Sequence, residues 1–309
     1  MNKIKTLFHC LIHDRRKIKL VLLYKFSRLY SDKKFLERLF KLRMQKELNL
    51  DNPQSFSEKL QWLKLYNRKP EYTLMVDKYE AKKYVADIIG KEYIIPTIGV
   101  WDRVEDIDWE ALPNQFVLKC THDSGGIVIC KDKANLDIKM SIKKLEKSMK
   151  RDYFYDNREW PYKNVKKRII AEQFIDSEGH QDLPDYKFFC FNGEPKYCQV
   201  IRDRNSKMTI DFYDMEWSHM PFIGLNPVNP VNPVAKNGLK PVMKPKYLSE
   251  MVNICQKLAT GIPFSRIDLY SVNEKIYFGE ITFFPASGLG EFTPKEWNYI
   301  FGSWITLPN

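Results

Sequence analysis

The segment FSRIDLYSVNEKIYFGEIT (264–282) contains two runs of β-forming residues separated by a short polar stretch. A three-residue turn centred on Glu274 would pair Asp268 with Glu280 and Arg266 with Thr282. Because side chains alternate along a strand, these four residues then share one face of the sheet. The segment therefore predicts an antiparallel hairpin that carries two directly opposed carboxylates.

Opposed carboxylates repel each other, so Asp268 and Glu280 need a compensating cation. Mg²⁺ prefers hard oxygen ligands and usually bridges to substrate phosphates while it keeps several waters. The acid pair thus predicts a magnesium site. Two other interpretations stay open here: the register slips by one residue, or Arg266 neutralises the pair as a salt bridge.

A second predicted hairpin consists of FVLKC (116–120) and IVICK (127–131), on either side of THDSGG. Lys119 ends an otherwise apolar run, a position that suits a phosphate, and Gly125 and Gly126 would let backbone N–H groups approach it. Glycines at a hairpin tip also serve as plain turn formers, and His122 and Asp123 are equally typical of a polar loop.

Two further predicted strands carry polar side chains that suit a nucleotide. Glu172 interrupts the apolar run IIAEQFI (169–175), where it accepts either from a neighbouring donor or from a ligand such as an adenine amine. Asp185 and Lys187 share one strand face, from which they could reach a ribose hydroxyl and a phosphate. A surface salt bridge is the alternative for this second pair.

The rest of the chain alternates helical and β patterns, which indicates an α+β protein. Ser55 and Glu58 form a capping-box pattern ahead of one helix, and a second helix follows Asp77 and ends at Gly90. The other expected elements are a strand within 94–101, a helix at 137–151, a hairpin at 185–201 that turns at Asn-Gly, and a helix at 247–259. The repeat NPVNPVNPV (226–234) predicts an exposed extended loop.

The positive charge of the chain is concentrated near its beginning. Residues 1–45 contain 13 Lys/Arg and 3 Asp/Glu, whereas the remainder is nearly balanced. Apolar residues at helical spacing in the same segment predict basic amphipathic helices, which suit either an anionic membrane surface or a helical collar on the domain. Recognition of nucleic acid is disfavoured because no motif for it is present.

Several classes of protein are excluded by what the sequence lacks. No apolar run is long enough for a membrane span, and no secretory signal opens the chain, so a cytoplasmic location is expected. The six cysteines are widely spaced, which predicts neither a zinc site nor a disulfide framework. The phosphate-binding loop of the P-loop enzymes, the nucleophile elbow, the kinase signature and a sound dinucleotide fingerprint are all missing.

Taken in order, Asp77-Lys78, Lys119 with its glycine hairpin, AEQFI, RID and GEITFFPASG resemble the ATP-grasp superfamily. More narrowly, NPQSFSEKLQWLKLY, DKYEAKKYV, IGVWD, DYKFFCFNG and FYDMEW are similar to its TupA-like branch, associated with teichuronopeptide and other surface-polysaccharide synthesis. The resemblance implies two α+β subdomains that clasp ATP. The expected divisions are a basic helical segment (1–50), a helical subdomain (51–113), a small ATP-grasp subdomain (114–175) and a large one with the metal site (176–309).

Carried over by position, the resemblance implies a full nucleotide site. The expected ATP-binding residues are Lys78, Lys119, His122, Ser124, Gly125, Gly126, Glu172, Gln173, Ile175 and Asp185. Of these, Glu172 would meet the adenine amine, Gln173 and Ile175 would offer backbone contacts to the adenine edge, and Asp185 would bind the ribose. Asp268, Glu280 and Thr282 are the expected magnesium ligands, although asparagine is usual at the position of Thr282. Arg266, which would steady an acyl phosphate, and Lys187 are the catalytic candidates.

The implied activity is an ATP- and Mg²⁺-dependent carboxylate–amine ligase that acts through an acyl phosphate. Its substrates would be a small carboxylate and an amine, plausibly an amino acid and a sugar acid or sugar amine of a surface polysaccharide. A lipid-linked or polymeric acceptor would place the enzyme on the inner face of the membrane, through residues 1–45. The alternatives are a glycosyltransferase, an ATP-dependent sugar phosphotransferase and a binding module without catalysis.

Overall fold

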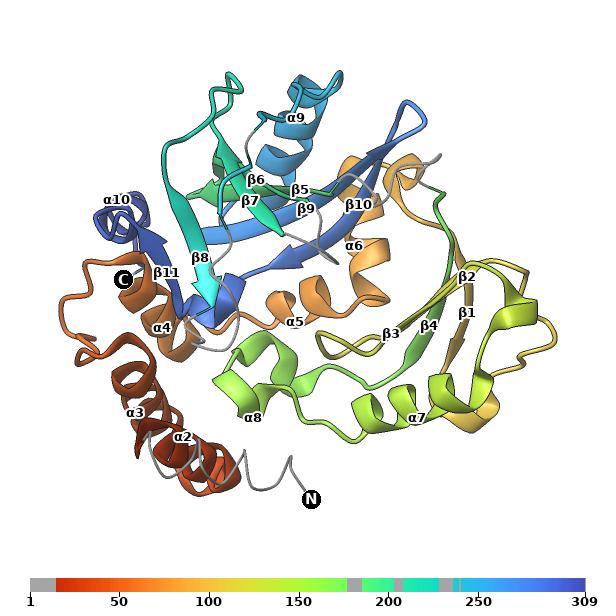
Figure 1. The fold of residues 1–309 in the computed structure, drawn as a ribbon, viewed down its shortest axis with the longest axis horizontal. Coiled ribbons are helices and arrows are strands. Elements are labelled where there is room, and N and C mark those ends of the chain that lie inside the picture. The colour runs from red at the N-terminus through yellow and green to blue at the C-terminus, as the bar shows by residue number, and fades with distance from the viewer. Residues whose placement is uncertain (1–14, 177–184, 203–207, 228–235, 239, 309) are drawn as a thin grey trace.

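Two antiparallel sheets, of five and four strands, organise the described part of the chain, and a third antiparallel sheet has two strands (Figure 1). The computed structural model describes residues 15–176, 185–202, 208–227, 236–238 and 240–308. Its helices are α2 (Arg15–Lys25), α3 (Asp32–Met44), α4 (Phe56–Tyr66), α5 (Glu71–Val76), α6 (Glu80–Ile89), α7 (Ile138–Met149), α8 (Phe154–Asn157), α9 (Leu248–Ala259) and α10 (Trp297–Ser303). Its strands are β1 (Thr97–Trp101), β2 (Phe116–Cys120), β3 (Ile127–Cys130), β4 (Ile169–Gln173), β5 (Asp185–Phe191), β6 (Glu194–Arg202), β7 (Thr209–Tyr213), β8 (Ile223–Pro227), β9 (Phe264–Val272), β10 (Lys275–Thr282) and β11 (Gly290–Thr293).

The larger sheet has five strands in the order β10-β9-β5-β6-β7. β5 and β6 are joined by Asn192 and Gly193, both with positive φ, as the Asn-Gly pair predicts for a tight hairpin. On one side of this sheet, α9 packs its buried face against β5, β6 and β9. The core also includes an aromatic group in which Phe56 of α4 contacts Phe264 of β9 and Phe301 of α10.

The β9–β10 hairpin pairs Asp268 with Glu280 and Arg266 with Thr282, as predicted, but the predicted turn is wrong. Only Asn273 and Glu274 lie between the last paired residues, with φ of 52° and 60°, as in a two-residue turn. That turn alone would set the strands one residue out of register. A β-bulge at Gly279, between Phe278 and Glu280, restores the pairing of the acids.

The smaller sheet has four strands in the order β1-β4-β2-β3. β2 and β3 form the predicted glycine hairpin, and α7, whose first turn is capped by the side chain of Asp137, packs on both of them. β1 pairs with β4, so this sheet begins at Thr97, ahead of the 114–175 range expected for a small subdomain. A separate hydrophobic cluster lies between this sheet and α7.

Helices α4, α5 and α6 share the core of the larger sheet, since Phe56, Leu60, Met75 and Val85 all belong to its hydrophobic cluster. The predicted capping box at the start of α4 is present: Ser55 and Glu58 satisfy each other's backbone N–H groups. α6 ends at Gly90, as expected. The short helices α5 and α8 were not expected from the pattern of residues.

Helices α2 and α3 lie at the edge of the molecule, at the lower left of Figure 1. They share a small hydrophobic cluster centred on Phe35 and Leu39. Within the described parts of the chain, no helix combines the length and the apolar character that a membrane span needs. Residues 1–14 of the expected basic helical segment lie outside the described residues. The same is true of most of the NPV repeat, whose first two residues, Asn226 and Pro227, end β8.

Candidate functional site

A row of charged side chains crosses three strands of the larger sheet. Glu280 on β10 is paired with Asp268 on β9, which in turn is paired with Lys187 on β5. The Lys187 ammonium contacts the Asp268 carboxylate and lies 2.8 Å from Asp185 Oδ2. The local rule of alternation along each strand therefore brings together four of the predicted site residues.

Arg266 lies between the two opposed acids. Its Nε is 2.7 Å from Asp268 Oδ1, and its second amino group donates to Glu280 Oε1 at 3.0 Å and Thr282 Oγ1 at 3.1 Å. The salt-bridge interpretation left open above is thus the one that this state of the protein adopts. Three carboxylates nevertheless face only two cations among the ion-paired residues of this cluster, and the next nearby cation, Lys78, acts on Glu280 without an ion pair to it.

The two opposed acids have very different acidities. Burial raises the pKa of Asp268 to about 6, although Arg266 and Lys187 act in the opposite direction. Burial would also raise the pKa of Glu280, but Arg266, Lys187 and Lys78 together lower it to about 2. Glu280 is also the more accessible acid, because 45% of its side chain is exposed against 2% for Asp268.

The donors in this cluster are carboxylate and hydroxyl oxygens, which fit Mg²⁺ chemically. They do not form a complete cage, since the described residues contain no group of three His, Cys, Asp or Glu side chains that could hold a metal ion. A magnesium ion held by two carboxylates and by phosphate oxygens needs no such group. To occupy the site, it would displace the Arg266 guanidinium from between the acids.

A second charged cluster lies on the smaller sheet and has the opposite sign. Glu172 of β4 is 5% exposed, and its oxygens are each 2.5 Å from a lysine nitrogen, one of Lys119 on β2 and the other of Lys82 on α6. These two cations lower the pKa of Glu172 against the effect of its burial. Two lysines around one carboxylate leave a positive charge in excess.

Tyr270 and Lys78 connect the two clusters. Burial raises the pKa of Tyr270, and Asp185 and Glu280 from the larger sheet and Glu172 from the smaller one raise it further. Lys78 donates to the backbone carbonyl of Asp123 in the glycine hairpin, and its charge is also stabilised by Glu280. The negative and positive clusters therefore lie close enough to act on the same tyrosine.

The glycine hairpin combines a buried base with an exposed tip. Ser124 and Gly125 are exposed, and Gly125 has a φ of 123° that L side chains rarely adopt. Gly126 lies against Ser148 of α7, whose Oγ would be 2.1 Å from an added Cβ. His122 is buried beside Ser148 O, 3.1 Å from its Nε2, and burial lowers its pKa, so it belongs to the support of the loop.

The remaining predicted residues lie at the end of β4. The Gln173 side chain is exposed, but its backbone N–H already donates to Pro96 O at 3.0 Å. Ile175 is partly buried two residues beyond the end of the strand. Lys82 was missed by the sequence analysis, although its place four residues after Lys78 in the DKYEAKKYV motif could have indicated it.

A second missed group surrounds the turn that follows β10. Lys64 of α4 is fully buried and donates to Ser287 O at 2.8 Å and Asn157 O at 2.9 Å, while Ser287 Oγ donates to Glu159 Oε1 at 2.6 Å. Burial lowers the pKa of Lys64 to about 8 and raises that of Glu159. Ala286 and Ser287 have φ of 49° and 54°, a strained conformation that this buried group holds in place.

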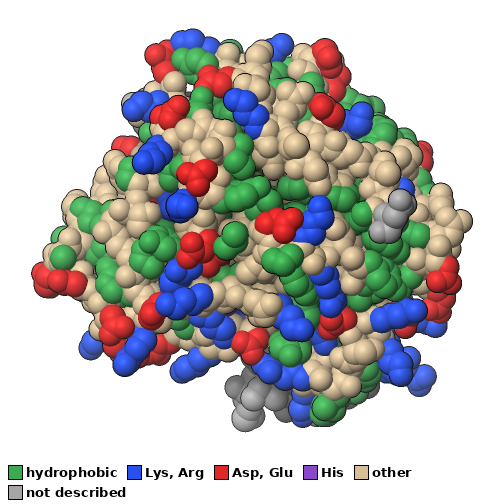
Figure 2. All heavy atoms as spheres, turned by 180° about the vertical axis from the view of Figure 1, so that it is seen from behind, with side chains coloured by type: hydrophobic (Ala, Val, Ile, Leu, Met, Phe, Trp, Pro, Cys, Tyr) green, Lys and Arg blue, Asp and Glu red, His purple; other side chains and the backbone are tan. Residues whose placement is uncertain are grey.

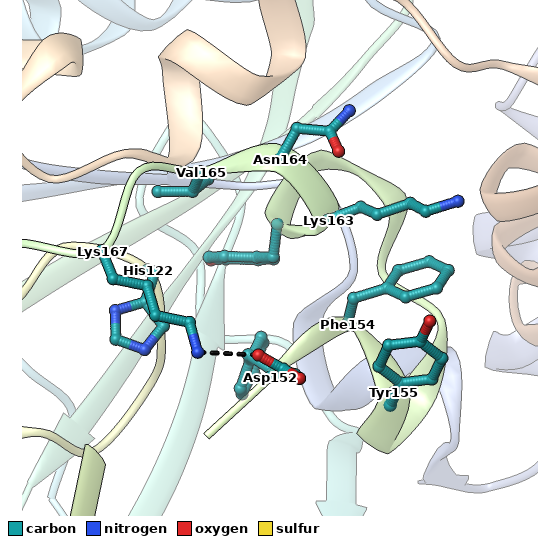
Figure 3. A pocket seen from close by; sticks show the side chains of 10 residues that line it. His122, Asp152, Phe154, Tyr155, Lys163, Asn164, Val165 and Lys167 are labelled. Carbon is teal, nitrogen blue, oxygen red and sulfur yellow. Dashed lines mark hydrogen bonds and ion pairs between the residues drawn. The ribbon is translucent and has the colours of Figure 1, made fainter. Parts of the chain in front are cut away.

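Figure 3 shows a pocket of about 220 Å³ beside the glycine hairpin. Its lining includes His122, Lys167, and several aromatic residues of the 153–162 segment. Glu280 contributes to the raised pKa of two of these, Tyr153 and Tyr162, so this wall of the pocket lies near the acid cluster. The lining also includes Asp152, which pairs with Lys167 at 2.7 Å.

Comparison with known proteins yields a family and several similar structures. The family model described as TupA-like ATP-grasp matches residues 58–306, whereas no curated protein matches the chain. D-alanine–D-alanine ligase from Bacillus anthracis, complexed with ATP, is 14% identical, with a TM-score of 0.40 over 70% of this chain and 55% of the ligase. The same enzyme from Helicobacter pylori is 13% identical, with a TM-score of 0.41 over 81% of this chain and 69% of the ligase.

The ATP-grasp ligase PsnB, complexed with a minimal precursor, Mg and ADP, is 10% identical, with a TM-score of 0.37 over 74% of this chain and 57% of PsnB. This chain spans little more than half the length of PsnB and of the Bacillus ligase. The family match extends from the first turn of α4 to beyond α10. The protein therefore belongs to the TupA-like ATP-grasp family.

Proposed function

We propose that the protein is an ATP-dependent carboxylate–amine ligase that acts through an acyl phosphate. The observation that carries this proposal is the pair of oppositely charged clusters on two sheets, which lie close enough to act on the same residue, Tyr270. Magnesium with ATP presents a cation and a row of phosphates, and so has charges complementary to both clusters. Membership in the ATP-grasp family supports the same ligand.

In this proposal the smaller sheet binds the nucleotide. Lys78 and Lys119 contact the phosphates, and the 122–126 loop closes over them with the backbone N–H groups of Ser124 and Gly125. Glu172, Gln173 and Ile175 would contact the adenine, and an adenine amine would share Glu172 with its two lysines. Asp185 would bind the ribose.

The larger sheet would carry the chemistry. Asp268, Glu280 and Thr282 would hold Mg²⁺, which when bound supplies positive charge at the phosphate oxygens. Arg266 and Lys187, which both pair with Asp268 when no ligand is bound, would then lie beside the transferring phosphoryl group. Release of Arg266 from the acids would free its guanidinium to bind the acyl phosphate.

The reaction has two steps. A carboxylate oxygen of the first substrate attacks the γ-phosphorus, and the bond to the bridging oxygen of ADP breaks. The amine nitrogen of the second substrate then attacks the acyl carbon, phosphate leaves with the electron pair of its C–O bond, and the nitrogen loses a proton. The products are an amide, ADP and phosphate.

We further propose that the amide joins an amino acid to a sugar of a surface polysaccharide, such as a capsule, O-antigen or teichuronic-type polymer. The resemblance of several motifs to the TupA-like branch supports this substrate class. The acceptor would be lipid-linked or polymeric. The enzyme would then work at the inner face of the membrane, with residues 1–45 in contact with it.

An ADP-release assay with pairs of amino acids and sugar acids or sugar amines tests the activity, with mass analysis of the product. We expect ADP release to require both substrates and to yield an amide. Glu280→Gln should abolish it, whereas Glu274→Gln, at the exposed tip of the same hairpin, should not. A phosphorylated sugar in place of an amide would identify a phosphotransferase, and transfer from a nucleotide sugar without ATP would identify a glycosyltransferase.

A further inference from the structure

The outer face of α2 carries an exposed apolar stripe. Its members are Ile18, Val21, Leu22, Phe26 and Leu29, the last two just beyond the helix in the turn that follows. The spacing of three or four residues places Ile18, Val21 and Leu22 on one side of the helix, and the turn continues this side. Val21 is 55% exposed, Leu22 48% and Leu29 80%, so the stripe has no partner within the described chain that covers it.

The opposite face of α2 is already used for packing. Leu23 is buried in the cluster with α3, and the Tyr24 ring meets that of Phe35 edge to face at 6.2 Å. Tyr24 also donates to Asn157 Oδ1 at 3.3 Å, and Ser27 O accepts from the buried Arg158. The rotation of α2 about its axis is therefore fixed, and the apolar stripe cannot turn inward without loss of these contacts.

Basic side chains accompany the stripe, and acidic ones do not. Residues 15–31 contain six Lys/Arg and no Asp/Glu. Lys19, Lys25 and Arg28 are all exposed, and Lys25 lies within the stripe itself, where a long side chain can keep its charge in water while its stem covers apolar surface. Seen from behind in Figure 2, Lys and Arg side chains are frequent along the lower part of the molecule, where α7 and α8 lie as well as α2 and α3.

Other exposed large hydrophobic residues do not form such a stripe. Leu74, Ile98, Ile129, Met140 and Met243, for example, lie on separate elements. Scattered apolar residues of this kind are normal on a protein surface. A continuous apolar face on a helix whose charged residues are all basic is instead typical of a helix that lies in the headgroup region of a membrane.

We propose that α2 and the turn after it form the membrane-docking surface, with the apolar stripe inserted at the headgroup level of an anionic bilayer. This inference rests on the membrane contact in the proposed function and names the residues and lipid chemistry that make it. The charge of the helix selects an anionic bilayer over a second copy of this chain, because two such basic faces would repel each other.

Docking through α2 would also bring the pocket of Figure 3 to the membrane. Arg28, at the end of the stripe, pairs with Asp152 of the pocket lining. Arg158, fully buried, ties Ser27 O and Asp32 to the α8 end of the same segment. A lipid-linked acceptor could then reach the pocket without leaving the bilayer surface.

The test is co-sedimentation of the full chain with vesicles of phosphatidylcholine alone or with about 30% phosphatidylglycerol, which provides an anionic surface. We expect binding only to the anionic vesicles. Leu22→Asn should weaken it about tenfold, because the lost leucine no longer inserts. Met140→Asn, which changes a more exposed apolar residue on α7, is the matched control and should have no effect.

A charge variant provides the second arm. Lys19→Gln with Lys25→Gln should weaken binding to anionic vesicles by about tenfold or more, and added salt should do the same to the unmodified chain. The proposal is overturned if binding ignores lipid charge, if Leu22→Asn and Met140→Asn behave alike, or if Leu22→Asn converts an oligomer to a monomer. The assay needs neither ATP nor substrate, so its failure leaves the ligase proposal untouched, and the reverse is also true.

Discussion

The two clusters of ion-paired residues differ in which charge is in the majority. On the larger sheet, Asp185, Asp268 and Glu280 outnumber Lys187 and Arg266. On the smaller sheet, Lys82 and Lys119 outnumber Glu172. Buried charge is costly unless it is compensated, so each excess marks a place where a ligand of the opposite charge would stabilise the protein.

The comparison also separates two tasks. The negative cluster holds Arg266 and Lys187 in fixed orientation and would accept a cation, so its loss should affect turnover. The positive cluster would accept phosphates, so its loss should affect nucleotide affinity. Variants in the two clusters should therefore fail in different kinetic parameters.

The largest expected effect is a loss of turnover caused by a substitution in the negative cluster. Asp268→Asn should lower kcat about a thousandfold, because it removes a proposed magnesium ligand and the carboxylate that pairs with Lys187. Steady-state ADP release measures this, with Glu274→Gln as the control at the exposed hairpin tip. Turnover within about threefold of the unmodified enzyme would remove the proposed metal site.

Asp268→Asn, which should lower turnover, should raise the free energy of unfolding. The folded pKa of Asp268, about 6, exceeds its ordinary 3.8, so between these pH values the folded chain holds a proton that the unfolded chain has lost. Stability from this group is therefore present at low pH and lost as the pH rises through about 6. Relative to the unmodified protein, Asp268→Asn should gain up to about 3 kcal/mol between about pH 4 and about pH 7.5.

Urea unfolding without nucleotide at those two pH values checks this prediction. Asp102→Asn, an exposed residue paired with Lys166, is the control and should show no such change between the two conditions. An equal stability difference at both pH values would mean that burial does not hold the Asp268 carboxyl near a pKa of 6. In that case the pH dependence of stability would give no evidence that the negative cluster is the one more destabilised by burial of its charge.

A smaller effect is expected from the positive cluster. Lys119→Met should raise the dissociation constant for ATP about thirtyfold, as loss of one charge-assisted hydrogen bond would, with Lys82 left to neutralise Glu172. Isothermal titration of ATP measures this. Lys131→Met, just after β3, is the matched control. A fall in kcat with an unchanged affinity for ATP would contradict the assignment of nucleotide binding to the positive cluster.

The smallest of these effects tests the geometry of the acid pair. Gly279→Ala would place a Cβ 2.9 Å from the backbone oxygen of Asp268, so the bulge must shift. We expect kcat/KM to fall about tenfold, the scale of a slightly misplaced catalytic group. Asn273→Gly in the turn of the same hairpin, where φ is 52°, should leave kcat/KM unchanged. Equal losses in both variants would point to general damage to the hairpin.

Strand alternation and turn chemistry made much of this fold predictable. The pairing of Asp268 with Glu280, the glycine hairpin, the Asn-Gly turn and the capping box at Ser55 all follow from local patterns, and the structure contains each. The register of the acids was predicted through an incorrect turn. The predicted turn was one residue too long, and the bulge at Gly279, which no local sequence rule predicts, cancelled that error.

Contacts between distant segments were not predictable. Lys64, Glu159 and Ser287 meet only because α4, the 159–164 segment and the turn after β10 converge in the folded chain. No periodicity links such positions, and a lysine within an amphipathic helix reads as a surface residue. Arg266 was recognised as a site residue, but its choice between neutralising the acids and binding a ligand depends on distances that a sequence does not contain.

The bulge at Gly279 separates the tip of the β9–β10 hairpin from the part that carries Asp268 and Glu280. Because the acids are aligned by the bulge, extra residues inserted between Asn273 and Glu274 would lengthen an exposed loop and leave Asp268 opposite Glu280. The tip is thus a natural attachment point for a spectroscopic label. A probe placed there would report on nucleotide binding from the same hairpin that carries the acids.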